Sequence, residues 1–207
     1  MRVIILSWEF PPRKVGELAN YVRKLTVNLV ERGVATHLVT YHDFLTGEYE
    51  EPEGIRVYRV SNPIYTHIGV LTWVLTLNQE VERAAANVYY KTKKQVDLID
   101  VHDWHFVHAA VTLKKAFTLP FVYSVESLER HRSHGADSPF NMAIESVEWL
   151  GFYEAKKVIV KSEWMRDEVT RIYDVPLEKI KIIHPNSETW IKDITETYQE
   201  VAGDHYP

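Results

Sequence analysis

The side chains best suited to chemistry follow an apolar run near the middle of the chain. Residues 102–105 read His-Asp-Trp-His, with His108 three positions further on. This spacing suits a metal site, but no Glu or Cys nearby completes a ligand set, and side chains at a strand end diverge between its faces. We therefore predict no metal. Two interpretations stay open: Asp103 caps the following helix above a packed Trp104, or the turn contacts a sugar through its carboxylate and aromatic rings.

A second group of titratable residues follows the next apolar run. Glu126 comes directly after residues 122–125, and Glu129 and Arg130 stand just beyond it. Two carboxylates could supply the acid and the base of a hydrolase or lyase acting on a sugar. The alternative, which we favour, is an ion pair between Glu126 and Arg130 across one helical turn, worth ~0.3–0.5 kcal/mol. The sequence has no G-x-S-x-G, P-loop or G-x-G-x-x-G motif.

The third candidate is the loop Arg-Lys-Val-Gly-Glu-Leu at residues 13–18. Gly16 opens a long amphipathic segment, so the loop ends at an expected helix N-terminus, where backbone N–H groups attract anions. The residue after this glycine is Glu17, which is itself an anion. Two interpretations follow: Glu17 fills a phosphate pocket as a resident anion, or it is an ordinary first-turn residue that points away from the pocket.

These candidates need a scaffold in which strands and helices alternate. The β-rich runs predict strands at residues 2–6, 36–40, 55–60, 98–102, 121–125, 158–161 and 180–183. Apolar periodicity indicates helices at residues 18–30, 70–90, 106–117, 139–155 and 164–173. Strands joined by crossover helices predict an α/β fold, a single Rossmann-like, doubly wound domain with a mainly parallel sheet. Ligands of such domains bind at the carboxyl ends of the strands, where strand order reverses.

Composition limits the cellular setting and the partners. The chain has 207 residues, of which 45% are hydrophobic and 26% charged, with no cysteine and a formal net charge of −5. No segment is long and apolar enough to span a bilayer, and the first apolar run is too short for a secretion signal. The absence of cysteine fits a reducing compartment. We expect a cytoplasmic protein without membrane or nucleic-acid partners and without a cofactor.

We place the Rossmann-like domain at residues 1–186 and a C-terminal helical segment with a tail at residues 187–207. The acidic stretch at residues 47–54 is expected to be a solvated loop, and the residues after Ala202 a loose end. The helix expected at residues 70–90 is apolar nearly all round, which indicates burial against the sheet or, more weakly, a homo-oligomer surface. Its apolar residues include Leu71, Trp73, Val74, Leu75 and Leu77.

Several segments, taken in order, resemble the N-terminal half of GT-B retaining glycosyltransferases, in particular glycogen and starch synthase-like enzymes. They are Trp-Glu-Phe-Pro-Pro at residues 8–12, Lys-Val-Gly at 14–16, His-Asp-Trp-His at 102–105, Leu-Pro-Phe-Val-Tyr at 119–123 and Val-Pro-Leu-Glu-Lys-Ile at 175–180. The similarity runs from Met1 to about Asn186. It implies an N-terminal domain that holds the acceptor glucan and faces a second domain that holds most of the nucleotide sugar.

The resemblance also implies roles for single residues. Family members place a Lys-x-Gly-Gly loop against the donor phosphates and the His-Asp-Trp-His turn near the sugar, and a histidine follows the strand that corresponds to residues 121–125. The implied substrate-binding residues are Lys14, Gly16, Glu17, His102, Trp104 and His105. The candidate catalytic residues are Asp103 and Glu126, and the ligand is a glucan or a nucleotide sugar.

This chain departs from the family pattern at three functional positions. Glu17 replaces the second loop glycine, Glu126 replaces the histidine, and Ser187 replaces the glycine expected after Pro-Asn. A carboxylate 4 Å from a phosphate charge would cost ~1 kcal/mol in water and ~4 kcal/mol at an effective dielectric of 20. We expect a domain that is catalytically incomplete alone and contacts a glucan or a protein partner. The alternative is the acceptor half of a split glucosyltransferase that needs a separate donor-binding domain.

Overall fold

The computed structural model describes residues 1–51 and 53–203, which form one eight-stranded sheet. The strand order is β3-β4-β2-β1-β5-β6-β7-β8, and all neighbouring strands are parallel except β3 and β4. The strands are β1 (Arg2–Ser7), β2 (Ala35–Tyr41), β3 (Gly47–Glu50), β4 (Arg56–Val60), β5 (Leu98–His102), β6 (Phe121–Ser124), β7 (Lys157–Val160) and β8 (Ile180–Ile182). The order reverses between β1 and β5, which makes the sheet doubly wound, as predicted.

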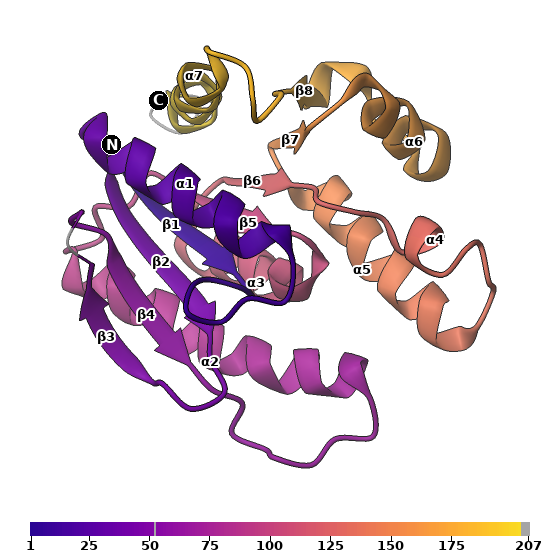
Figure 1. Ribbon diagram of the computed structural model, residues 1–207, viewed down its shortest axis with the longest axis horizontal. Coiled ribbons are helices and arrows are strands. Elements are labelled where there is room, and N and C mark those ends of the chain that lie inside the picture. The colour runs from indigo at the N-terminus through magenta and orange to yellow at the C-terminus, as the bar shows by residue number, and fades with distance from the viewer. Residues whose placement is uncertain (52, 204–207) are drawn as a thin grey trace.

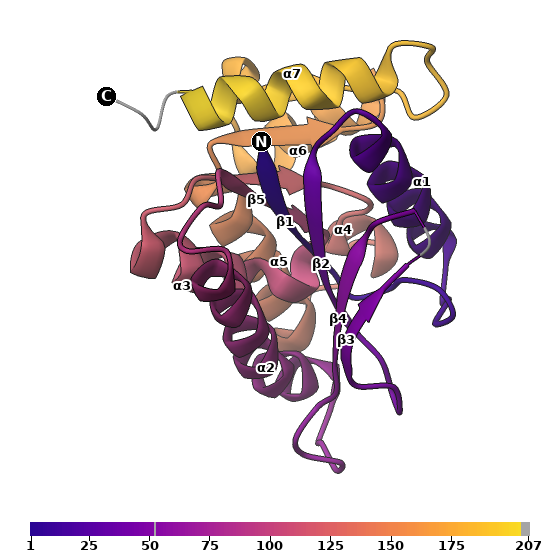
Figure 2. The ribbon, with the colours of Figure 1, turned by 90° about the vertical axis from the view of Figure 1, so that its left-hand side faces the viewer.

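Helices cover both faces of this sheet, as Figures 1 and 2 show. They are α1 (Glu17–Glu31), α2 (Val70–Lys91), α3 (Val107–Phe117), α4 (Glu129–Arg132), α5 (Pro139–Glu154), α6 (Glu163–Tyr173) and α7 (Trp190–Gly203), with short 3-10 helices η1 (Trp104–Phe106) and η2 (Leu177–Lys179). Side chains of α1 and α7 enter one apolar cluster, and those of α2, α3, α5 and α6 enter the other. In the part of the chain that the structure describes, no helix could cross a membrane.

Most of the expected elements are present, and one strand was missed. Residues 47–50, which we had predicted to be solvated loop, form the antiparallel edge strand β3 against β4. All four residues of β3 are exposed, so the alternation of apolar and polar residues that marks a half-buried strand is missing. The loose end predicted after Ala202 falls largely on residues 204–207, outside the described residues.

Two helices illustrate how local sequence sets the helix ends. At α5, Ser138 is the N-cap, its hydroxyl accepts a hydrogen bond from the Asn141 N–H at 3.1 Å, and Pro139 occupies the first turn. In α1, Leu18, Val22, Leu25 and Leu29 recur on one buried face. The apolar face of α2 also packs on the sheet, because its Val74 and Leu77 are fully buried.

A buried polar network links the C-terminal helix to the centre of the sheet. The Asp100 carboxylate on β5 accepts hydrogen bonds from the Ser124 hydroxyl at 2.8 Å and from the Tyr198 hydroxyl on α7. His102 Nε2 lies 3.0 Å from the same carboxylate. Burial alone would raise the pKa of Asp100, but His102 and the two hydroxyls outweigh it and leave the pKa below its usual value. The network therefore fixes α7 on the face that α1 covers.

Close packing of α5 depends on a glycine. A Cβ on Gly151 would lie 2.8 Å from Tyr123 Cε1 and 3.0 Å from Val107 Cγ2, which is too close for any side chain. Gly151 thus lets α5 approach β6 and α3 directly.

We expect Gly151→Ala to lower the free energy of unfolding by about 1–3 kcal/mol, because overpacking outweighs the better helix propensity of alanine. Chemical denaturation would measure the change. Gly203→Ala is the matched control, since nothing lies within 4 Å of a Cβ at that helical glycine, and it should be neutral or slightly stabilising. A Gly151→Ala protein as stable as its parent would contradict this packing account.

Candidate functional site

Acidic, basic and aromatic side chains line a cavity at the carboxyl ends of β1 and β5. Ser7, the last residue of β1, is paired with His102, the last residue of β5, so the segments that follow leave the sheet side by side. The cavity has a volume of about 660 Å³. It lies at the strand-order reversal, where ligands of doubly wound domains bind. Its main polar lining is Glu9, Glu17, Asp103, His105, Glu126, Glu129 and Arg132.

Asp103 holds an unusual backbone conformation at the floor of this cavity. Its φ of 62° and ψ of 177° fall in a region that is almost restricted to glycine, at a typical cost of about 1–3 kcal/mol. The expected helix cap is wrong, because the Asp103 side chain makes no capping hydrogen bond. Its Oδ1 has no hydrogen-bond partner and lies 4.0 Å from Arg132 Nη1. The strained backbone thus presents a buried carboxyl group that is not fully satisfied.

The electrostatic surroundings of Asp103 favour its neutral form. Burial raises the pKa of the carboxyl to about 7, Arg132 opposes the rise, and the carboxylates of Glu148 and Glu126 add to it. A carboxyl group with a pKa near neutrality can both accept and return a proton under physiological conditions. Asp103 is therefore the strongest acid–base candidate in the cavity.

His105 lies in the same cavity between aromatic rings. Its imidazole stacks on the Trp8 ring with centroids 4.2 Å apart and on Trp104 at 4.3 Å. Burial, reinforced by Arg132 and Arg13, lowers the pKa of His105 to about 3. The imidazole is consequently neutral at physiological pH and can donate or accept a hydrogen bond without bringing charge to a ligand.

The loop before α1 already contains a bound anion, and that anion is Glu9. The buried Glu9 carboxylate accepts hydrogen bonds from the backbone N–H groups of Val15 and Gly16, both at 2.8 Å. Glu17 lies at the cavity lip, where it is exposed and its carboxylate accepts a hydrogen bond from Asn20 at 3.4 Å. The hypothesis of Glu17 as the resident anion is therefore wrong. An internal carboxylate does occupy the loop, but it belongs to Glu9, just after the end of β1.

Arg132 on α4 is the cation of the cavity, and acidic groups hold it in place. Its guanidinium donates to Glu129 Oε2 at 3.0 Å and to Glu148 Oε1 at 2.7 Å. Glu148, whose side chain is fully buried on α5, also accepts from the Glu129 N–H and the Tyr173 hydroxyl. Arg132 is thus fixed at one wall, facing Asp103.

Glu126 and Glu129 form neither the acid–base pair of a hydrolase nor the ion pair with Arg130 that the sequence suggested. Glu126 forms an ion pair with Lys161, whose ammonium lies 3.9 Å from the centroid of the Tyr21 ring. Arg130 instead pairs with Asp137 at 2.6 Å, so the expected ion pair between Glu126 and Arg130 is wrong. Because Glu126 and Glu129 are each already bound to a cation, the structure gives no support to a hydrolytic acid–base pair.

The structure brings together six of the eight side chains or backbones that the sequence singled out. Those that line the cavity are Gly16, Glu17, Asp103, Trp104, His105 and Glu126. Lys14 is exposed and outside the lining. His102 is fully buried toward Asp100 and Tyr21, on the face opposite to Trp104, so the expectation that it binds substrate does not fit its position. Among the described residues, no cluster of three or more potential ligands could hold a metal ion.

Sequence reasoning did not single out three side chains that line the cavity, namely Trp8, Glu9 and Arg132. Trp8 and Glu9 were visible as the segment that directly follows the first strand, next to the strand-order reversal. Arg132 carried no comparable signal, because its place opposite Asp103 depends on how α4 turns back across the cavity.

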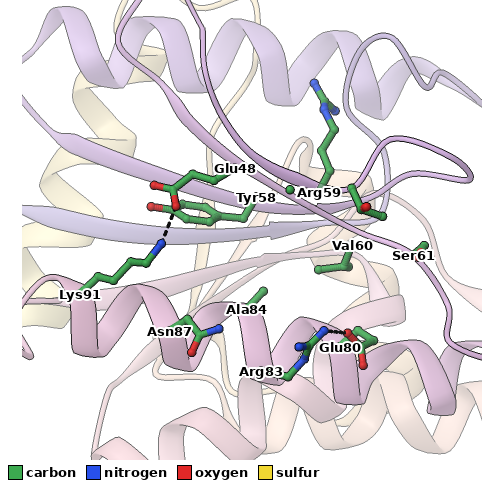
Figure 3. A pocket seen from close by; sticks show the side chains of 12 residues that line it. Glu48, Tyr58, Arg59, Val60, Ser61, Glu80, Arg83, Ala84, Asn87 and Lys91 are labelled. Atoms are coloured by element: carbon green, nitrogen blue, oxygen red, sulfur yellow. Dashed lines mark hydrogen bonds and ion pairs between the residues drawn. The ribbon is translucent and has the colours of Figure 1, made fainter.

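A second cavity lies between the β3–β4 hairpin and α2, and Figure 3 shows its side chains. Its volume is about 350 Å³. The charged groups there already have partners: Lys91 pairs with Glu48, Arg83 with Glu80, and Arg59 with Glu51 outside the lining. It lies away from the strand-order reversal and contains none of the predicted site residues, so the cavity at β1 and β5 is the better candidate.

Residues 18–185 match the family described as Glycosyltransferase Family 4. The chain belongs to this family. An uncharacterized glycosyltransferase of Methanocaldococcus jannaschii is 35% identical, with the match covering 97% of this chain and 50% of that protein. A glycogen synthase of Mycobacterium tuberculosis is 26% identical over 88% of this chain and 47% of its own length.

A solved structure supports the fold. Sucrose-phosphate synthase from Thermosynechococcus elongatus superposes with a TM-score of 0.72 at 18% identity, over 88% of this chain and 47% of that one. The family 4 chain thus corresponds to the N-terminal type of GT-B domain, and the resemblance seen in the sequence is confirmed. It spans about half the length of the curated relatives that it matches.

We expect Asp103→Asn to stabilise this family 4 domain above pH 7. The folded carboxyl has a pKa of about 7 against 3.8 in a model compound, so the folded state binds more protons than the unfolded state between these values. The free energy of unfolding of the parent therefore falls as the pH rises through this window, by up to about 1.4 kcal/mol for each pH unit. Asparagine does not titrate, so the variant does not lose this stability. Urea unfolding across the window measures the effect.

The control is Asp137→Asn, which alters an exposed ion pair and should change stability by about 0.5 kcal/mol or less. Parallel pH profiles for Asp103→Asn and its parent would show that burial does not perturb Asp103.

Proposed function

We propose that this domain is the acceptor-side half of a hexosyltransferase and that its cavity binds a glucan hydroxyl for glycosyl transfer. The donor nucleotide sugar is bound mainly by a second domain, on the same polypeptide or on a separate one. The domain is catalytically incomplete without that second domain. Membership of glycosyltransferase family 4 and similarity to a glycogen synthase support the reaction class.

The observation that carries the proposal is the sign of the charge in the cavity. Its lining includes five carboxyl-bearing residues but only one arginine, Arg132. An excess of negative charge opposes a pyrophosphate and leaves a neutral, polyhydroxylated ligand unaffected. Carboxylates also accept hydrogen bonds from sugar hydroxyls, which are donors as well as acceptors. The cavity thus suits an acceptor sugar better than the phosphates of a donor.

The side chains of the cavity can be given roles under this proposal. Asp103 accepts the proton of the acceptor hydroxyl as the new glycosidic bond forms, because its pKa of about 7 suits proton transfer near neutrality. The neutral His105 fixes a second hydroxyl. Trp8 and Trp104, which sandwich that imidazole, restrict its orientation.

The loop before α1 supports the assignment of the donor to another domain. Its Val15 and Gly16 N–H groups, which could otherwise bind an anion at the start of α1, donate to Glu9 instead. A donor phosphate would have to displace two charge-assisted hydrogen bonds of ~1.5–3 kcal/mol each and then meet the displaced carboxylate. Donor affinity in this domain alone is accordingly low.

Titration of the 207-residue chain with maltopentaose, followed by the indole N–H signals of its tryptophans, tests the acceptor role. We expect the signals of Trp8 and Trp104 to shift with saturation. Asp103→Asn should weaken binding about three- to tenfold, through loss of a hydrogen bond worth ~1 kcal/mol.

Asp137→Asn serves again as control, because Asp137 is exposed and does not line the cavity. Maltopentaose that leaves both indole signals unmoved, or binds equally well to Asp103→Asn, would rule out this acceptor site.

A further inference from the structure

Two exposed aromatic rings stack on the outer face of α5, far along the helix from the cavity. Trp149 and Tyr153 are one helical turn apart, with ring centroids 5.2 Å apart and an angle of 15° between the ring planes. Trp149 is 48% exposed and Tyr153 is 66% exposed. Exposed aromatic side chains that contact each other form a contiguous apolar patch, which is a candidate binding surface. We call Trp149 and Tyr153 the aromatic platform.

The aromatic platform borders a cavity of its own. This cavity has a volume of about 380 Å³ and lies between the C-terminal part of α5 and the loop that joins α6 to β8. It is lined by Trp149, Phe152, Tyr153, Tyr173, Asp174, Val175, Pro176 and Lys179.

The cavity beside the platform is separate from the acceptor cavity. The first residues of α5, Phe140 and Asn141, line the acceptor cavity, whereas Trp149 and Tyr153 lie near its other end, where the chain enters β7. Figure 1 shows α5 extending from the side of α4 to the start of β7. The platform therefore faces the amino ends of the strands, while the acceptor cavity faces their carboxyl ends.

Polar groups at the platform are of two kinds. Lys179 Nζ donates one hydrogen bond to the backbone carbonyl of Tyr153 at 2.8 Å, and its ammonium keeps its positive charge and its other N–H donors. Asp174 is exposed at a left-handed backbone position with φ of 53°, and within the described residues its carboxylate takes part in no hydrogen bond or ion pair. The cavity beside the platform therefore offers a carboxylate that can accept hydrogen bonds and an ammonium that can still donate them.

We propose that the aromatic platform is a second carbohydrate site, which binds a chain of linked pyranose rings. A pyranose has an apolar face of C–H groups, which packs on the negative face of an aromatic ring, and an edge of hydroxyl groups, which donates to a carboxylate. Trp149 and Tyr153 supply the rings, and Asp174 supplies the carboxylate. The site would hold a glucan on the domain away from the point of transfer.

The carboxylate of Asp174 decides between a sugar and an apolar protein surface as the occupant. Covering the platform with an apolar partner would bury this carboxylate without a hydrogen bond, which costs several kcal/mol. A sugar covers the rings and satisfies the carboxylate together. An anionic ligand gains no net attraction there, because Asp174 repels it while Lys179 attracts it.

The tryptophan signals that report on the acceptor cavity also permit an independent test of the platform. During a maltopentaose titration of the 207-residue chain, the indole signal of Trp149 should shift and saturate.

Trp149→Ala and Tyr153→Ala should each weaken binding at the platform about three- to tenfold, the loss of one stacking contact. The Tyr153→Ala protein retains the Trp149 signal, so its affinity can be read from that residue directly. In Trp149→Ala the platform signal is absent, and backbone amide shifts of α5 report instead.

A control variant and the tryptophan signals of the acceptor cavity distinguish the possible results of this titration. Trp164→Ala removes a tryptophan of similar exposure that packs on His131 rather than on the platform, and it should leave the platform affinity unchanged. Shifts of Trp8 and Trp104 without any at Trp149 would overturn the platform proposal while leaving the acceptor proposal intact, and the reverse pattern would do the opposite. A Trp149 signal that moves with protein concentration instead of sugar, and stops doing so in Tyr153→Ala, would also overturn the proposal by identifying a self-association surface.

Discussion

The site depends on one interaction, the capture of the loop before α1 by the Glu9 carboxylate. Two backbone N–H groups at the start of that helix could bind an anion from solution, but the segment just after β1 supplies the anion internally. The two charge-assisted bonds pin the loop against the sheet and complete one wall of the cavity. They also fix the charge of that wall as negative before any ligand arrives.

A second set of charged groups holds the opposite wall of the cavity. Glu9 is buried on one side of the cavity, and Glu129 and Glu148 are buried on the other. Arg132 is the counter-charge near Asp103, but it already binds Glu129 and Glu148. Burial outweighs the attraction of Arg132 and keeps the pKa of Asp103 near neutrality. A domain so arranged suits the handling of a hydroxyl proton, and it is poorly suited to hold phosphates without help.

The sequence allowed the fold to be predicted well and the site only in part. Strands buried on both faces are continuous apolar runs, so β1, β5 and β6 were recognisable, whereas the exposed β3 carried no pattern. The turn at Asp103 was found because its His-Asp-Trp-His residues directly follow an apolar run that is typical of a buried strand. His102 was misassigned because neighbouring residues at a strand end point to opposite faces, and the face could not be fixed from residue types. The roles of Glu9 and Arg132 required knowledge of which loops meet in space.

The central claim is that the loop anion and the acidic lining exclude the donor phosphates from this domain. Calorimetric titration of the 207-residue chain with ADP-glucose and UDP-glucose, at low ionic strength where weak binding is easiest to detect, tests it most directly. The account predicts no saturable binding of either nucleotide sugar up to ligand concentrations of about 1 mM, where a complex would have a binding free energy of only about −4 kcal/mol. A one-to-one complex with a dissociation constant near 1 μM, about −8 kcal/mol, would contradict it.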